Sequence, residues 1–421
     1  MNDEPNEAKT MTMDLQRKLD EWQNKSRAEL VEGERMLTHK LGSRLAVLSG
    51  YGSTPKLLRS KIFAGLRDEI DRLAFGYEFG AYAPTGVLTK PFWRAVSWDL
   101  HHGLSFEGIL EVIKTHPIIS KADVICLTSV DLGLARSGNR NVARSLAIET
   151  ECNYVFASHY LHFGPQNFAK ADIVGLEGVV VLSRLPLSRP RVVALENGKD
   201  PMCDTRKRYG SPKALLVDVD FVGVPLTLGC VSFDVLSSPK HRGVQMEHLL
   251  SSVRAEPGAL PTLIGGAFNT STYDASSVWG LAAGLANKAS RGVDYILDEH
   301  HTYPERHFET AVFHSLKKHG FSWEALNEMG RGTFHMSGEE LAASAALNPV
   351  LPSWMVKSAR RLLRSHGDKI SLKLDWFAAS ERVISSSHPQ AEKPKVVGQL
   401  SDANGRLSTH DPIVLDFEII S

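Results

Sequence analysis

Short apolar runs separated by polar turns dominate the chain from Phe92 onward. Several of these runs have the length and β-branched content of strands, namely RAVSWDL, ADVICLTS, CNYVFAS, GVVVLS and PTLIGG. The segments 106–116, 141–149 and 242–253 instead place apolar residues at helical spacing. Many strands, tight hairpins and few helices predict two packed mixed β-sheets flanked by helices, an α/β (α+β) protein built as a four-layer α-β-β-α sandwich.

The first part of the chain has a different pattern of polar and apolar residues. Residues 1–12 predict disorder, and residues 15–48 are charged with apolar residues at loose helical spacing, which predicts one or two amphipathic helices. Residues 56–73 read as helical again, and the Gly, Tyr and Pro of residues 77–91 predict a linker. We therefore expect an N-terminal helical region and linker over 1–88 and a main domain over 89–421. The helices either pack on their own domain or bind a partner.

The charge balance, the cysteines and the lack of long apolar stretches exclude several classes of function. Lys plus Arg and Asp plus Glu both number 48, so no net field would hold a polyanion, and we expect no strong non-specific binding of nucleic acid. The four cysteines show no CxxC spacing, which predicts buried free thiols. No apolar stretch approaches the length of a membrane span and the N-terminus has no apolar signal region, so we expect a cytoplasmic protein.

Six phrases, in order along residues 92–421, carry a resemblance to a known family. They are SWDLHHG, ADVICLTSVD, VVVLSRLPL, VSFDVLSSPKHRGVQMEHLL, KLDWFAAS and LSTHDPIVLDFEI, and the strand LIGGAFNTSTYD precedes the last two. Together they resemble the endonuclease/exonuclease/phosphatase superfamily, the DNase I-like metal-dependent phosphoesterases. The resemblance implies the two-sheet sandwich and, as the activity of the family, hydrolysis of phosphate esters with Mg²⁺ or Mn²⁺.

The same phrases show that the family's acids are replaced in this chain. The resemblance places the principal metal-binding Glu at Ser129, the acid of the GDFN motif at Ala267 and the acid of the SDH motif at Thr409. Mg²⁺ takes only one or two protein carboxylates, so each loss is severe. The family's phosphate-binding His is also missing from the strand Val231 to Asp234, its hairpin Asn is Val179, and its first-strand Asn is Asp99.

Three positions keep the family's residue: Asn269, Asp375 and His410. The resemblance implies a hydrogen-bonded Asp375–His410 dyad, which is either a general base or a structural remnant. Asp99 is a weak candidate metal ligand, and with Asp234 and Asp375 it could form a relocated acidic site. His101, His102 and Arg206 are weak candidates for binding a phosphate group.

Other clusters carry less weight. Residues 298–301, DEHH, suggest metal ligands by composition, but consecutive loop residues do not converge on one ion, so a solvated loop is expected. A basic loop over 199–213 and a basic helix over 357–369 could hold an anion or form ordinary solvated faces. A Ser408–His410–Asp375 hydrolase is conceivable, but the chain has no G-x-S-x-G elbow.

Two functions follow from this pattern. The first is a catalytically impaired pseudoenzyme with no metal cofactor, which acts as a binding or scaffolding module for an anionic phosphate ligand or a protein partner. The alternative is a divergent phosphodiesterase or phosphatase that uses Mg²⁺ or Mn²⁺. The second hypothesis requires Asp99, Asp234, Asp375, Asn269 and His410 to converge around an open space.

Overall fold

The structure is a computed structural model. It describes residues 31–84, 86, 89–164, 174–256, 258–274, 291–292, 295–337, 339–340 and 369–420.

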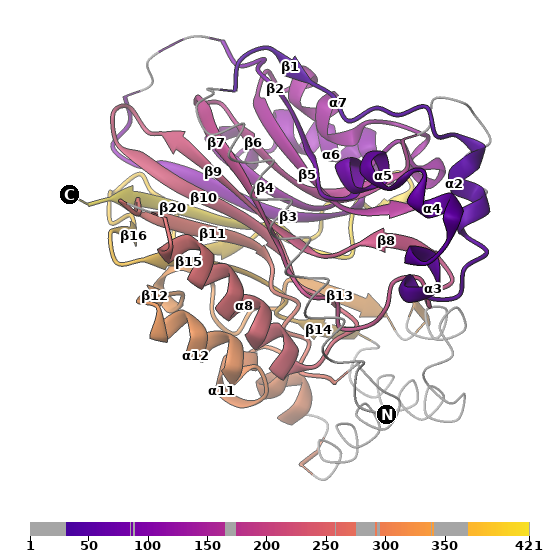
Figure 1. Ribbon diagram of the computed structural model, residues 1–421. Helices are drawn as coiled ribbons and strands as arrows, with labels where there is room; N and C mark the ends of the chain where they lie inside the picture. Colours follow the sequence, from indigo (N-terminus) through magenta and orange to yellow (C-terminus); the bar gives the residue numbers. More distant parts are fainter. Residues whose placement is uncertain are drawn as a thin grey trace.

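Two β-sheets pack face to face in the described part of the chain (Figure 1). The larger sheet has ten strands; eight follow the order β1 (Glu34–Arg35), β2 (Tyr77–Gly80), β5 (Asn153–His162), β6 (Leu176–Ser183), β4 (Val124–Leu132), β3 (Trp93–His102), β20 (Ile413–Ile419) and β16 (Val383–Ser385), with β8 (Arg208–Gly210) on β5 and β17 (Lys395–Val396) on β20. The smaller sheet has six strands, in the order β12 (Phe321–Ser322), β15 (Asp375–Ser380), β11 (Thr262–Ala267), β10 (Pro225–Ser232), β9 (Lys213–Asp220) and β7 (Leu187–Ala194). Each sheet contains one parallel pair, β3 with β4 and β10 with β11, so both are mixed.

Helices cover the outer faces of both sheets, which completes the predicted four layers. The helices α8 (Pro239–Arg254) and α12 (Thr310–Lys318) cover the smaller sheet beside α11 (Pro304–His307), and the apolar residues of α8 and α12 share a core with that sheet (Figure 1). The larger sheet carries α6 (Phe106–Thr115) and α7 (Val142–Glu149). The remaining short elements are α2 (Ser43–Leu48), α3 (Thr54–Leu58), α4 (Lys61–Ala64), α5 (Arg67–Ala74), the 3-10 turns Ile119–Lys121, Ala135–Ser137 and Glu324–Leu326, the π-helix Ile296–His300, and the hairpins β13 (Phe334–Ser337)–β14 (Lys369–Leu372) and β18 (Ser401–Asp402)–β19 (Gly405–Arg406).

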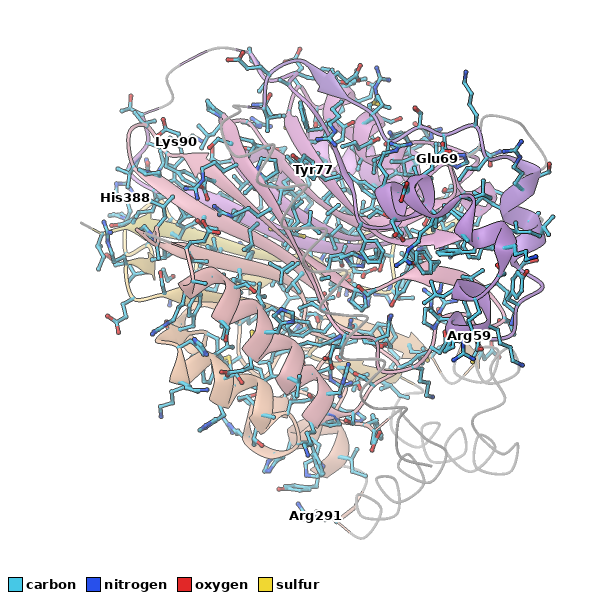
Figure 2. The ribbon with its side chains drawn as sticks, viewed as in Figure 1. Arg59, Glu69, Tyr77, Lys90, Arg291 and His388 are labelled. Carbon is cyan, nitrogen blue, oxygen red and sulfur yellow. The ribbon has the colours of Figure 1, made fainter. Side chains whose placement is uncertain are left out.

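The main hydrophobic core lies between the two sheets. Leu127 and Val180 of the larger sheet and Leu228 and Leu263 of the smaller one belong to the same buried cluster. Side chains fill the space between the two sheets in Figure 2. Burial of this much apolar surface is the dominant favourable contribution to folding.

The described N-terminal residues are part of this core, which corrects the predicted boundary. Tyr77–Gly80 is not a linker but strand β2, and it pairs with β5 of the larger sheet. Residues 34–35 then pair with β2, and Leu45, Phe63 and Leu73 are buried in the core shared with that sheet. Leu37 and Leu41 are buried outside any helix. The described residues before position 85 therefore share a core with the larger sheet, and the part of the predicted helical region 15–48 that precedes residue 31 lies outside the described residues.

The cysteines are free, as expected, but they are not all buried. Cys126, Cys152 and Cys230 are buried, whereas Cys203 is exposed. No helix among the described residues has the length and apolar content needed to span a membrane.

Candidate functional site

The residues that the sequence singled out meet at one end of the sandwich. Asp99 and Ser129 lie near the carboxyl ends of the parallel strands β3 and β4, and Ala267 is the last residue of β11. Asp375 opens β15, directly opposite Ala267 in the strand register, and His410 precedes β20. The ends of parallel strands are where α/β proteins commonly bind ligands.

Gly266 explains why β11 can deliver Ala267 to this place. Its φ is 145°, and a Cβ atom there would lie 2.0 Å from the carbonyl oxygen of Val231 on the neighbouring strand. Only glycine allows this close approach between β10 and β11.

His410 and Asp375 form the predicted dyad. The Nδ1 atom of His410 lies 2.7 Å from Oδ2 of Asp375. The hydroxyl of Thr333 donates to the same Oδ2 at 2.6 Å and accepts the backbone N–H groups of Leu374 and Asp375 at 3.0 Å. Thr333 thus fixes the carboxylate in the orientation that holds the imidazole.

The carboxylate of Asp99 accepts three hydrogen bonds from neighbouring residues. Its Oδ2 accepts the hydroxyls of Thr128 at 2.8 Å and Ser129 at 2.6 Å, and its Oδ1 accepts the backbone N–H of His101 at 3.0 Å. Burial raises the pKa of Asp99, but the charge of His410 and these hydrogen bonds outweigh burial and lower it. The residue that replaces the family's metal-binding Glu is therefore itself a hydrogen-bond donor to Asp99.

His410 is cationic at neutral pH. Burial lowers its pKa, but the carboxylates of Asp375 and Asp99 and the hydrogen bond to Asp375 raise it to about 9. An imidazole with this pKa already carries its proton at pH 7, so it can donate a proton but cannot accept one as a general base. This protonation state argues against the base function considered from the sequence.

The segment around Phe334 covers the dyad. The ring of Phe334 packs edge-on against the imidazole of His410, with centroids 5.0 Å apart. The backbone of Phe334 forms an isolated β-bridge with His410, and the N–H of His335 donates to the carbonyl of Thr409 at 3.0 Å. His410 is 9% exposed as a result.

The three positions of the family's lost acids do not fit a magnesium ion. Ala267 is fully buried and has no ligating atom, the Ser129 hydroxyl is committed to Asp99, and the carbonyl of Thr409 accepts from His335. Among the described residues, the buried Oδ1 atom of Asp375 has no hydrogen-bond partner, so this place offers one free carboxylate oxygen. Mg²⁺ requires a near-octahedral set of oxygens that these side chains do not supply.

The side chains of Asn269 and Asp234 bind backbone groups, although the N–H of Asn269 donates to the carbonyl of Leu374, next to Asp375, at 3.1 Å. Asn269 donates from Nδ2 to the carbonyl of Phe233 at 2.6 Å, so it ties two strand ends together. Asp234 accepts the backbone N–H groups of Gly198 at 2.6 Å and Leu236 at 2.8 Å, as a loop-stabilising residue does. Asp99, Asp375 and His410 thus lie together, while the amide of Asn269 and the carboxylate of Asp234 are used to hold strand ends and loops.

Ser408 is not a nucleophile of a Ser–His–Asp triad. Its hydroxyl donates to the carbonyl of Asp99 at 2.6 Å and accepts the backbone N–H of His410 at 3.1 Å. The hydroxyl is thus committed to the backbone, where it fixes the loop before β20, rather than to the imidazole of His410.

Of the three weak phosphate-binding candidates, His101 and His102 lie next to each other, with ring centroids 5.8 Å apart. His101 is exposed, whereas the Nδ1 atom of His102 points to Asp131, 3.3 Å from Oδ1. Arg206 is exposed and pairs with Asp204 at 2.9 Å. Other basic residues of the loop over 199–213 are also bound within the protein: Arg208 pairs with Glu177 and Asp204, and the amine of Lys207 donates to the carbonyl of Met202. The predicted basic helix over 357–369 lies outside the described residues except for Lys369, which opens β14.

Residues 298–301 are not the solvated loop that the sequence predicted. His300 and His301 are buried, in and directly after the π-helix. His301 lies 2.8 Å from the hydroxyl of Tyr273, so its imidazole takes part in the packing beneath the loop that follows β11.

Sequence reasoning missed a charged cluster beside His102. One ligand atom each of His102, Asp131 and Glu177 lies within 4.8 Å of the others, and Arg136 bridges both carboxylates. Asp131 lies near the end of one apolar run and Glu177 lies near the start of another. These runs are far apart in the sequence, so no local motif marks the cluster.

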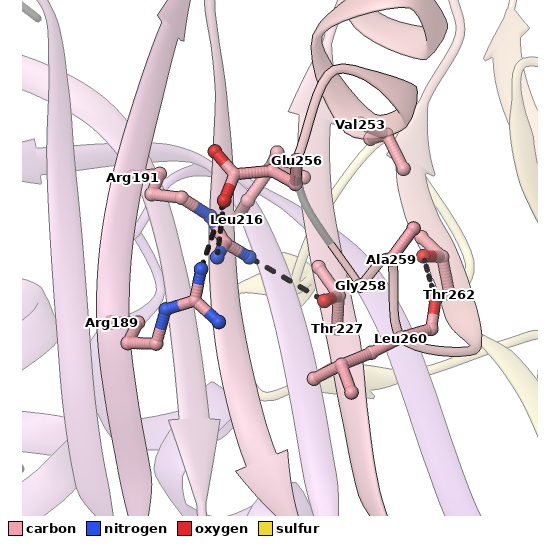
Figure 3. A pocket seen from close by; sticks show the side chains of 10 residues that line it. All are labelled: Arg189, Arg191, Leu216, Thr227, Val253, Glu256, Gly258, Ala259, Leu260 and Thr262. Atoms are coloured by element: carbon pink, nitrogen blue, oxygen red, sulfur yellow. Dashed lines mark hydrogen bonds and ion pairs between the residues drawn. The ribbon is translucent and has the colours of Figure 1, made fainter. Parts of the chain in front are cut away.

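A recess at the opposite ends of β10 and β11 is too small for an organic ligand. It offers about 10 Å³ to the centre of a water molecule, enough for about one water. Figure 3 shows the side chains of Arg189 and Arg191 in its wall, with Glu256 and Thr227 among their partners. Both guanidinium groups also pair with Asp218, so neither charge is left for an anion.

The fold and the site together define the class of this protein. It is a two-sheet sandwich that has a His–Asp dyad at the strand ends and lacks acids at the three expected metal-binding positions. No family model matches the sequence, and no curated protein matches it either. Solved structures of the endonuclease/exonuclease/phosphatase superfamily, which the sequence motifs resemble, are similar to this chain in fold.

Three solved structures illustrate this similarity. An endonuclease/exonuclease/phosphatase from Beutenbergia cavernae is 15% identical, with a TM-score of 0.46 over 79% of this chain and 72% of that chain. One from Bacteroides vulgatus is 11% identical, with a TM-score of 0.45 over 78% of this chain and 100% of that chain. A family protein from Leptotrichia buccalis is 11% identical, with a TM-score of 0.43 over 78% and 100%. The likeness concerns the fold, and activity rests on the residues of this chain.

Proposed function

We propose that this protein is a pseudoenzyme of endonuclease/exonuclease/phosphatase architecture that acts as a binding or scaffolding module. The observation that carries the proposal is the hydrogen bond from Ser129 to Asp99 at 2.6 Å. Where the family pattern places a metal-binding carboxylate, this chain has a hydroxyl that is used to satisfy a buried acid. The loss of several catalytic groups, each commonly worth ~10² to 10⁴ in rate, leaves no efficient hydrolase.

The charges around the dyad favour a protein partner over a phosphate group at this place. The carboxylates of Asp99 and Asp375 outnumber the single imidazolium of His410, and the ring of Phe334 covers that imidazolium. A phosphate would meet net negative charge with no metal ion to offset it. An anionic ligand would have to bind elsewhere on the surface, so we propose that the partner is a protein. The cytoplasmic location expected from the sequence belongs to the same proposal.

Hydrolysis of an activated phosphodiester tests the proposal. The substrate is bis-p-nitrophenyl phosphate with Mg²⁺ or Mn²⁺, and the proteins are the natural chain, His410→Ala and the triple replacement Ser129→Glu, Ala267→Asp, Thr409→Asp. We expect the natural chain and His410→Ala to give the same background rate. The triple replacement, in a stable and folded form, should bind Mg²⁺ in calorimetry while the natural chain does not.

A divergent phosphoesterase is the second candidate, favoured by the intact dyad with its 2.7 Å contact. Because His410 would act as an acid, such an enzyme should lose activity as pH rises through about 9. Metal-dependent hydrolysis by the natural chain that disappears in His410→Ala would establish this candidate and refute the pseudoenzyme proposal.

A further inference from the structure

Four side chains from four adjacent strands of the larger sheet converge beside the candidate site. His102 ends β3, Asp131 lies on β4, Glu177 on β6, and His162 ends β5. These strands are neighbours in the sheet order β5-β6-β4-β3. Asp131, His162 and Glu177 are buried, and His102 is partly buried.

Ligand atoms of His102, Asp131 and Glu177 all lie within 4.8 Å of one another, close enough to converge on one metal ion, and His162 contacts this group through Glu177. The Nδ1 atom of His102 lies 3.3 Å from Oδ1 of Asp131, and the Nε2 atom of His162 lies 3.0 Å from Oε2 of Glu177. Ligand atoms ~2.0–2.2 Å from a zinc ion stand roughly 3.3–3.5 Å apart in a tetrahedron. Both imidazole nitrogens are buried and neither contact has hydrogen-bond geometry, so the nitrogens face the carboxylates without bonding to them.

Arg136 places a positive charge between the two carboxylates of the cluster. Its Nη2 atom is 2.7 Å from Oδ1 of Asp131 and 2.7 Å from Oε2 of Glu177, the same two oxygens that the histidines approach. The guanidinium therefore stands where an ion would bind. The side chain of Arg136 is 29% exposed, so it can turn into solvent and leave the cluster.

Arg208 orients the cluster from outside. Its Nη1 atom donates to Oε1 of Glu177 at 2.7 Å, which leaves Oε2 directed at the histidines. Partners of this kind, which hold a ligating side chain in place, typically strengthen metal binding by roughly 10–100-fold.

We propose that His102, Asp131 and Glu177 form a binding site for a divalent transition-metal ion of the zinc type, with His162 supporting Glu177, and that Arg136 occupies the site in exchange for the ion. An imidazole ligand beside two carboxylates favours such an ion over Mg²⁺, which prefers oxygen ligands. The exchange keeps a positive charge beside the two buried carboxylates in both states, which avoids the large cost of leaving them unpaired. This inference does not depend on the proposed function, since the residues differ from the family's metal positions.

Titration of the metal-free full chain with Co²⁺ tests the site, because tetrahedral Co²⁺ gives an intense visible absorption. We expect one such ion per chain, displaced by Zn²⁺ and not by Mg²⁺. Glu177→Gln should abolish the absorption and His102→Gln should weaken binding about tenfold or more, whereas Arg136→Met, which removes the competing cation, should strengthen it about tenfold.

His101→Gln is the matched control, since it removes the neighbouring histidine, which is exposed. The chain has 17 histidines, so adventitious binding has to be separated from the site, and His101→Gln should leave the absorption unchanged. The proposal is overturned if neither the natural chain nor Arg136→Met develops the band, or if the band survives in Glu177→Gln. Neither result bears on hydrolysis of a phosphodiester, which tests the proposed function separately.

Discussion

The Nδ1 atom of His410 lies 2.7 Å from Oδ2 of Asp375, and this buried pair joins the last strand of the larger sheet to the smaller sheet. The pair is present although Ser129, Ala267 and Thr409 stand where the family pattern has acids. Thr333, Ser408 and Phe334 hold it from three sides through the contacts described above. A pair so supported stabilises the fold whether or not it takes part in chemistry, and this gives the first prediction.

His410 should make folding stability depend on pH. Its folded-state pKa of about 9 lies above the ordinary histidine value of 6.5, so its contribution is fully present below about pH 6.5 and is lost as pH rises through 9. The stabilising contribution of His410 is the difference in the free energy of unfolding between the natural chain and His410→Gln. We expect this difference to be larger near pH 6 than above pH 9, by about 3 kcal/mol. Urea unfolding at both pH values measures the difference.

The same replacement at His314, which is exposed on α12, is the control. It should change the free energy of unfolding little at either pH. A difference for His410→Gln that stays constant between the two pH values would show that the imidazole is not charged in the folded state.

Asp99 should contribute to the high pKa of His410. Asp99→Asn keeps an acceptor for the hydroxyls of Thr128 and Ser129 but removes the negative charge, so the pKa of His410 should fall by about one pH unit. An NMR titration of the His410 ring measures it. Asp234→Asn removes a carboxylate that binds the backbone of other loops and should leave this pKa unchanged. Equal effects of both changes would mean that Asp99 does not act on His410 directly.

Ser129 should be worth more to stability than an ordinary surface serine. Ser129→Ala leaves the buried carboxylate of Asp99 without one of its donors, at a cost of about 1–3 kcal/mol in the free energy of unfolding. Ser137→Ala, which removes a local hydrogen bond to the carbonyl of Leu134, should cost less than about 1 kcal/mol. Chemical denaturation of the two variants compares them, and a cost for Ser129→Ala no greater than that for Ser137→Ala would contradict the prediction.

Arg242 on α8 and Glu309, just before α12, form a fully buried ion pair that also holds the loop after β11. Glu309 accepts the N–H of Thr272 at 3.0 Å, and Arg242 donates to the carbonyl of Tyr273 at 3.2 Å. Glu309→Gln leaves Arg242 charged and buried, so we expect a loss of about 3–5 kcal/mol in the free energy of unfolding.

The chain offers a matched control for this pair. Lys318 and Glu247 join the same two helices, but their side chains are 58% and 36% exposed. Glu247→Gln should therefore cost less than about 1 kcal/mol. Similar losses for Glu309→Gln and Glu247→Gln would mean that burial does not set the cost of breaking these pairs.

The sequence anticipated the architecture because hydrophobic periodicity is a local property. The strands β3, β4, β5, β6 and β11 and the helices α6, α7 and α8 lie within a few residues of their predicted positions. Strand β2 was missed because Tyr77–Gly80 has only four residues and runs into a segment of Gly, Tyr and Pro, and it becomes a strand only by pairing with β5 across a long stretch of sequence. The predicted linker over 77–91 therefore begins in this strand.

Some features of the candidate site also follow from local sequence motifs, whereas others do not. The identities at Ser129, Ala267 and Thr409 follow from the motifs alone, and so does the pairing of Asp375 with His410, which the structure confirms at 2.7 Å. The motifs also suggested a relocated acidic site at Asp99, Asp234 and Asp375. The structure shows that Asp99 accepts from Ser129 and that Asp234 accepts from the backbone of Gly198, contacts that no motif predicts.

By itself the sequence determined which strands form, which family the motifs resemble and which acids are absent, since each of these depends on residues close together in the chain. Only the tertiary structure decided that Ser129 serves Asp99, that Phe334 covers His410, and that Arg136 stands among His102, Asp131, His162 and Glu177. The direction of a hydrogen bond and the convergence of charges depend on which strands are neighbours in the sheet, and strand order is set by packing of the whole chain.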